Sequence, residues 1–84
     1  MNILDTARMF PSLAAALSAR HVEEETAPSF LREQMHGDGG SGRKAAAAFV
    51  LSLSAGALVD MRHAWAVWDK AHREAAISVL RSLT

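Results

Sequence analysis

The chain has 84 residues, of which 50% are apolar and 21% are charged, a composition typical of one folded domain. Nine basic and nine acidic residues give a formal net charge of zero. This balance argues against nucleic-acid binding through bulk electrostatics and against an acidic mimic of DNA. The chain has no cysteine, which excludes disulfides, thiolate nucleophiles and zinc–thiolate sites, and which fits a reducing compartment.

No targeting segment or membrane span is expected. The stretch Met1 to Phe10 includes Asp5 and Arg8, which is not typical of a secretory signal. The longest nearly uncharged run, Ala45 to Val59, is shorter than the about 20 residues that span a bilayer. We therefore expect a cytoplasmic protein without membrane contact.

The first half of the chain predicts three short helices. Asn2 is expected to cap the first helix, which ends before Pro11. Ser12 is expected to cap the second helix. Thr26 is expected to start the third helix, which Gly37 ends.

The second half is expected to hold the core. The segment 37–42, GDGGSG, predicts a flexible joint, and Arg43 to Ser54 is apolar on nearly all faces, as a central helix is. Gly56 breaks this helix, Asp60 or a neighbour is expected to start the next one, and Asp69 is expected to cap the last helix. The core face of the last helix is assigned to Ala76, Ile77, Val79, Leu80 and Leu83.

No segment alternates apolar and polar residues as a strand does. We therefore predict an all-α fold, in which about five short helices pack around the central helix Arg43 to Ser54. Residues 1–84 are expected to form a single domain, with segment 37–42 as its flexible joint.

The sequence GDGGSGRK, from Gly37 to Lys44, partly matches a phosphate-binding loop. In that motif a lysine follows the second glycine and a serine or threonine then holds magnesium, but Arg43 and Ala45 do not fit this order. Asp38 would also repel phosphate. We expect a linker here, and the alternative is an anion held by amides at the start of the next helix.

His63 and His72 lie near acidic residues, but a spacing of nine fits neither a zinc motif nor one helix face. Asp69 precedes His72 by three residues, which suits a helix cap. No serine lies in a nucleophile turn such as GxSxG. We therefore expect no enzyme activity, no cofactor and no metal.

Two features are candidates for contact with a partner protein. Trp65 and Trp68 are either core residues or interface anchors, since tryptophan and arginine dominate interface hot spots. The run Glu23 to Glu25 is either a solvated loop or a docking patch, and it is expected to add nothing to helix stability. The candidate partner-binding residues are Arg62, Trp65, Trp68, Arg73, Glu23, Glu24 and Glu25.

A DNA-binding helix-turn-helix is the alternative function. Gly56 would lie in the turn and Leu58 to Trp68 would form the recognition helix, with Arg62 and His63 facing the bases. Asp60 and two tryptophans make this helix a poor reader of a DNA groove. Nucleic acid is therefore not the expected partner.

The strings AAAAFVLSL (Ala45 to Leu53) and DMRHAWAVWDKAHR (Asp60 to Arg73) resemble a group of short helical proteins of bacterial genomes and plasmids. The group shares an FVLSL helix followed by a VWDxAHR segment, and it implies no activity. In kind, the chain is also similar to the inhibitors, including anti-CRISPR proteins, that phages and mobile elements direct against host defence systems.

The second resemblance implies a non-enzymatic protein–protein interaction module that docks on a protein subunit. A homodimer is left open as well, because a short chain that is 50% apolar can leave a patch for a two-fold partner to cover.

Overall fold

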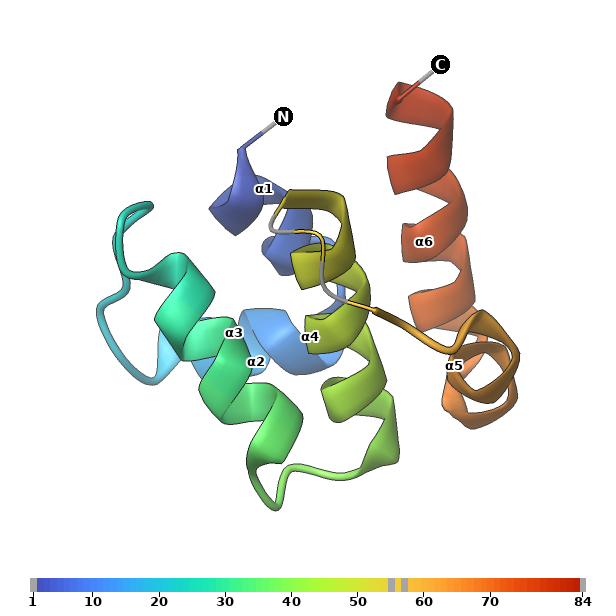
Figure 1. Ribbon diagram of the computed structural model, residues 1–84, viewed down its shortest axis with the longest axis horizontal. Coiled ribbons are helices and arrows are strands. Elements are labelled where there is room, and N and C mark those ends of the chain that lie inside the picture. Colours follow the sequence, from blue (N-terminus) through green and yellow to red (C-terminus); the bar gives the residue numbers. More distant parts are fainter. Residues whose placement is uncertain (1, 55, 57, 84) are drawn as a thin grey trace.

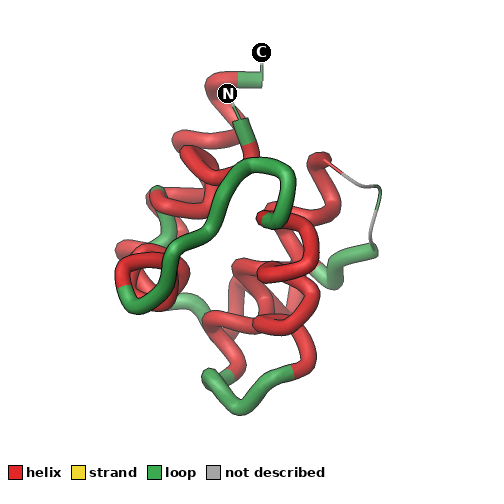
Figure 2. Tube along the Cα trace, turned by 90° about the vertical axis from the view of Figure 1, so that its left-hand side faces the viewer, coloured by secondary structure: helices red, strands yellow, loops and turns green. Residues whose placement is uncertain are grey.

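The computed structural model describes residues 2–54, 56 and 58–83. These residues form six helices and no strand (Figures 1 and 2), which confirms the predicted all-α fold. The helices are α1 (Ile3–Arg8), α2 (Pro11–Ser18), α3 (Ala27–His36), α4 (Ser41–Ser54), α5 (Met61–Val67) and α6 (Lys70–Ser82).

Helix α4 lies at the centre of the fold, as its apolar sequence predicts. It packs against α1, α2, α3 and α5, and Figure 1 shows it between α3 on one side and α5 and α6 on the other. Three of the six buried residues of α4 are alanines, whose short side chains allow neighbouring helices to approach closely. The buried residues of α4 are Ala45, Ala46, Ala47, Phe49, Val50 and Leu51.

Three helices begin with a side-chain cap, as predicted. Asn2, Asp60 and Asp69 each accept a hydrogen bond from the backbone N–H three residues further on, at 2.8, 3.1 and 2.9 Å. Each cap satisfies one of the N–H groups that the first turn of a helix leaves without a partner. These caps fix where α1, α5 and α6 start.

Two of the predicted boundaries are wrong. Helix α2 begins at Pro11, after an extended Phe10, so Ser12 lies inside the first turn and does not cap it. Proline fits this position because its missing N–H has no partner there in any helix. Helix α4 begins at Ser41, so the loop after α3 is shorter than the predicted joint 37–42 and includes Gly40 with a φ of +92°.

An aromatic cluster, formed by Phe10, Phe49 and Trp68, joins three parts of the chain. Its ring centroids lie 5.6 to 5.8 Å apart, and Phe49 meets the other two rings edge to face. All three side chains are buried, and Phe10 is fully so. The cluster therefore holds the α1–α2 corner, the middle of α4 and the end of α5 together.

We expect Phe10→Ala to lower the free energy of unfolding by about 3–5 kcal/mol, because it leaves a cavity between two aromatic rings. Urea denaturation measures this change as a lower midpoint at an unchanged slope. Leu58→Ala is the control: the Leu58 side chain is 93% exposed, so its truncation should change stability by less than about 0.5 kcal/mol. Equal losses in the two variants would contradict this role of the cluster.

Candidate protein-binding site

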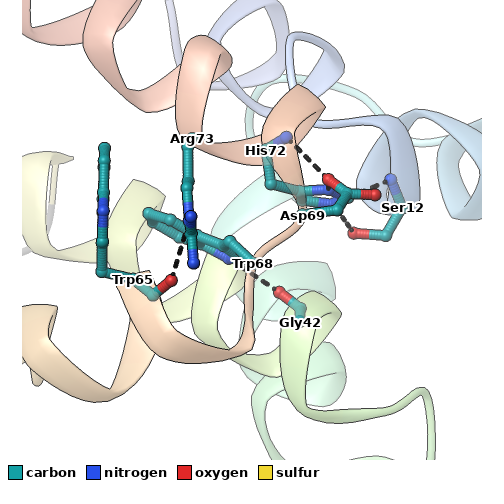
Figure 3. Close-up of polar contacts among 7 residues, drawn as sticks. All are labelled: Ser12, Gly42, Trp65, Trp68, Asp69, His72 and Arg73. Atoms are coloured by element: carbon teal, nitrogen blue, oxygen red, sulfur yellow. Dashed lines mark hydrogen bonds and ion pairs between the residues drawn. The ribbon is translucent and has the colours of Figure 1, made fainter.

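The strongest candidate site is an exposed tryptophan held by an arginine. Trp65, on α5, is 38% exposed, and the guanidinium of Arg73, on α6, lies 5.6 Å from the centroid of its ring. The Nε–H of Arg73 also donates to the backbone oxygen of Trp65 at 3.0 Å (Figure 3). The stacking and the hydrogen bond orient both side chains before any partner arrives.

Arg62 completes this surface, which we call the Trp65–Arg73 face. It is exposed and precedes Trp65 by three residues, a spacing that places both side chains on neighbouring parts of α5. None of the ion pairs in the described part of the chain includes Arg62 or Arg73. Both arginines therefore keep their charge available to a carboxylate of another molecule.

Trp68 does not belong to this face, so its prediction as a partner-binding residue is wrong. Its side chain is only 3% exposed, and its Nε1–H donates to the backbone oxygen of Gly42 at 3.1 Å (Figure 3). The physical reason is local: α5 ends at Val67, and the extended backbone of Trp68 turns its side chain inward. The sequence left open whether the two tryptophans are core residues or interface anchors. Trp68 is a core residue, and Trp65 lies at the surface.

The acidic run Glu23 to Glu25 does not join the Trp65–Arg73 face. Its segment lies at the opposite edge of the molecule from α5 (Figure 1). The carboxylate of Glu24 accepts hydrogen bonds from the N–H groups of Ile3 and Leu4, at 2.7 and 3.2 Å. Glu24 thus stabilises the positive end of α1, which corrects the expectation that this run adds nothing to helix stability. The contact of Glu24 is structural, and a docking patch at Glu23 and Glu25 stays a prediction.

His72 connects two helix starts that are far apart in sequence. Its Nδ1 lies 2.8 Å from Asp69 Oδ1, and its Nε2 lies 2.7 Å from Ser12 Oγ (Figure 3). Because the carboxylate only accepts hydrogen bonds, Nδ1 carries the proton and Nε2 accepts from Ser12. The backbone N–H of Ser12 also points to Nε2, at 3.3 Å. His72 thus caps α2 from α6.

This order of groups, serine to histidine to aspartate, is that of a hydrolase triad. A triad also needs N–H donors that face the substrate, which in many hydrolases include the residue after the serine. That residue here is Leu13, which is 0% exposed, and the N–H of Ser12 points to His72. The geometry therefore fits a link between helices better than a catalytic site. Sequence patterns give no signal for it, since the partners are 60 residues apart.

The recognition helix of the alternative, DNA-binding function is shorter than predicted. Leu58 and Val59 are not helical and Trp68 follows the helix, so only Met61–Val67 remains of the predicted Leu58 to Trp68. Seven residues make a helix about 10 Å long, with few side chains to place in a major groove. The predicted recognition helix is therefore corrected to this shorter segment.

Other kinds of site have little support in the described residues. No three histidine or acidic side chains there are placed to hold a metal ion. Two hollows, of about 100 and 380 Å³, lie between α1, α4 and α6 and between α3, α4 and α5, and neither is lined by Trp65, Ser12 or His72. None of the helices described has the length and apolar character to cross a membrane.

The chain matches no protein-family model, and the searches of curated proteins and of solved structures gave no match either. The resemblance to the bacterial FVLSL proteins and to anti-CRISPR inhibitors therefore stays a prediction.

The cap at the start of α6 predicts a pH dependence. Hydrogen bonds from the backbone N–H and then the ring of His72 lower the pKa of Asp69 below its ordinary value of 3.8. Its contribution to stability is therefore present above that ordinary value and is lost as the pH falls through the lowered pKa. We expect the difference in the free energy of unfolding between the unchanged protein and Asp69→Asn to become smaller in this acidic range.

Denaturation of both proteins between about pH 5 and about pH 2 measures this gap. Asp38→Asn is the matched control, because it removes an acid from the loop after α3 that caps no helix. A gap for Asp69→Asn that stays constant over this range would contradict the prediction.

The link from α6 to α2 predicts a ranking of two variants. His72→Ala removes a side chain that is only 8% exposed and leaves the Ser12 N–H without its acceptor, so we expect a loss of about 2–4 kcal/mol. Ser12→Ala removes one hydroxyl and should cost about 1 kcal/mol. Thermal unfolding of both variants checks the order, and the reverse order would exclude His72 as the main link.

Proposed function

We propose that this protein is a non-enzymatic protein–protein interaction module that docks through the Trp65–Arg73 face. In its most concrete form, it is an inhibitor from a phage or mobile element that binds a subunit of a host defence system and blocks it sterically, as anti-CRISPR proteins do. The observation that carries the proposal is the partly exposed Trp65, whose orientation is fixed by the stacking and the hydrogen bond of Arg73.

The chemistry of the face supports one class of partner. Tryptophan and arginine are among the residue types that contribute most binding energy at protein interfaces, and here Arg73 lies over the Trp65 ring. Arg62 and Arg73 are not in any ion pair in the described ranges, so a partner with carboxylates around an apolar pocket would complement them. The partner is therefore a protein surface with an apolar pocket and an acidic rim.

The overall charge supports a protein partner over DNA. The net charge of zero gives little long-range attraction to a phosphate backbone, whereas a local pair of arginines needs only a local pair of carboxylates. Steric blocking also fits the size of the chain. Once one face is bound, the rest of the helical domain covers the neighbouring surface of the target and keeps other molecules away from it.

The test compares two exposed apolar residues. Trp65→Ala should weaken binding by about 30-fold or more, because it removes the central anchor, whereas Leu58→Ala should leave binding unchanged. Each protein is immobilised, and the proteins retained from a bacterial lysate are identified and quantified. Support requires a protein that the unchanged chain and Leu58→Ala retain and that Trp65→Ala loses.

An infection assay tests the inhibitor form. The chain is produced in bacteria with an active CRISPR system, and survival of a targeted phage is counted. The unchanged chain and Leu58→Ala should protect the phage, and Trp65→Ala should not. A partner retained equally by all three proteins would overturn the binding face, and a phage left unprotected by the unchanged chain would overturn the inhibitor form.

A further inference from the structure

The larger of the two hollows lies between the end of α3, the first half of α4 and the start of α5, and we call it the α3–α4–α5 hollow. Its volume of about 380 Å³ is near the lower end of the range of about 300–1,000 Å³ found for small-molecule sites. Neither Trp65 nor Arg73 lines it, so it is separate from the Trp65–Arg73 face. A ligand that fills this hollow is therefore a small molecule.

The inner part of the hollow is apolar. Ala45 is buried and Ala48 is half-buried, and these two residues lie three apart on one side of α4. Met35 of α3 and Val59, which precedes α5, line the same space and are partly buried against the core. Because the two alanines have short side chains, this part of the hollow has room for a short aliphatic side chain of a ligand.

The rim of the hollow carries opposite charges. Ser41 and Lys44 lie three residues apart at the start of α4, so their hydroxyl and ammonium groups lie on the same side of the helix. Asp60 lines the hollow from the start of α5. Neither Lys44 nor Asp60 belongs to an ion pair in the described part of the chain. The hollow thus offers a positive and a negative group that do not neutralise each other.

Asp60 retains one carboxylate oxygen for a ligand. Its Oδ1 accepts the hydrogen bond from the backbone N–H of His63 that caps α5, at 3.1 Å, whereas none of the hydrogen bonds among the described residues reaches its Oδ2. A carboxylate accepts hydrogen bonds at both oxygens. An ammonium group can therefore bind Oδ2 while the helix cap stays in place.

We propose that the α3–α4–α5 hollow binds a free α-amino acid with a short aliphatic side chain, such as leucine. The ligand carboxylate binds Lys44 and Ser41, and the ligand ammonium group binds Oδ2 of Asp60. The aliphatic side chain lies against Ala45 and Ala48. The inference goes beyond the proposed function, because both the site and the ligand differ from those of the Trp65–Arg73 face.

Charge complementarity selects this class of ligand. A simple carboxylate would leave Asp60 without a partner, and a simple amine would leave Lys44 without one, whereas an amino acid carries both charges on neighbouring atoms. We expect a dissociation constant of about 1 mM, because water screens the exposed charges and one short side chain buries little area.

Titration of the isotope-labelled protein with L-leucine, followed through its amide chemical shifts, tests the site. The shifts should saturate and should be largest around Lys44 and Asp60. Two probes separate the charges: 4-methylpentanoate lacks the ammonium group of leucine, and 3-methylbutylamine lacks its carboxylate. Each should bind at least about 5-fold more weakly than leucine. Absence of saturable shifts up to about 20 mM leucine would overturn the proposal, and so would equal binding of the three compounds.

Two variants with matched controls test the charged contacts. Lys44→Gln and Asp60→Asn should each weaken leucine binding about 5-fold, and asparagine retains the ability to cap α5. Lys44→Gln should also lose the preference for leucine over 3-methylbutylamine, since the carboxylate no longer has its cation. Lys70→Gln and Asp38→Asn remove the same charges from residues that do not line the hollow, and both should bind normally. Equal weakening by the controls would contradict the proposed contacts.

Filling the hollow tests where the aliphatic side chain binds. Ala48→Leu should abolish leucine binding, because the added side chain occupies the apolar part of the hollow. Ala66→Leu is the control, since Ala66 is exposed on α5 and does not line the hollow. Binding that survives in Ala48→Leu, with thermal unfolding showing a folded protein, would overturn the site. Trp65→Ala should bind leucine normally, so failure of this site and failure of the Trp65–Arg73 face are distinguished.

Discussion

The contact between Phe10, Phe49 and Trp68 is the constraint on which the rest of the fold depends. The three rings come from the α1–α2 corner, the middle of α4 and the end of α5, which no local signal brings together. Edge-to-face packing restricts how each ring is turned as well as where it lies. The hydrogen bond from Trp68 to the first turn of α4 adds a further restriction. The aromatic cluster and this hydrogen bond together set the orientation of α5 and α6.

The candidate site inherits its geometry from that cluster. The Trp68 ring is fixed in the core. Helix α5, which precedes it, therefore places Trp65 at the surface, and α6 begins directly after it, with Asp69 as its cap. His72 then links α6 to α2, and the next residue, Arg73, lies over the exposed indole of Trp65. One short segment thus contains the exposed Trp65, the buried Trp68 and the helix cap Asp69. Within it, the buried tryptophan positions the exposed one.

Part of the fold could be predicted from the sequence because it depends on interactions between residues close together in the chain. A cap such as Asp60 acts within three residues, and the apolar character of α4 reports its central place directly, so both were found. Contacts that span the chain were not: Glu24 reaches α1 across about 20 residues, and Ser12 meets His72 across 60. The assignment of Ile77, Leu80 and Leu83 to the core was wrong for a different reason: they are 37%, 44% and 61% exposed, because α6 buries mostly small side chains against the fold.

The unequal environments of the two tryptophans have a spectroscopic consequence. The chain has two tryptophans and no tyrosine, so its ultraviolet fluorescence comes from one partly exposed indole and one buried indole, whose ring centroids lie 6.3 Å apart. With Trp65 replaced by phenylalanine, the remaining emission reports on the aromatic cluster alone. In the unchanged chain, an occupied face would remove water from Trp65 and move the combined emission of the two indoles to shorter wavelength. The Trp65→Phe protein therefore reports on folding and the unchanged chain reports on docking, without any added label.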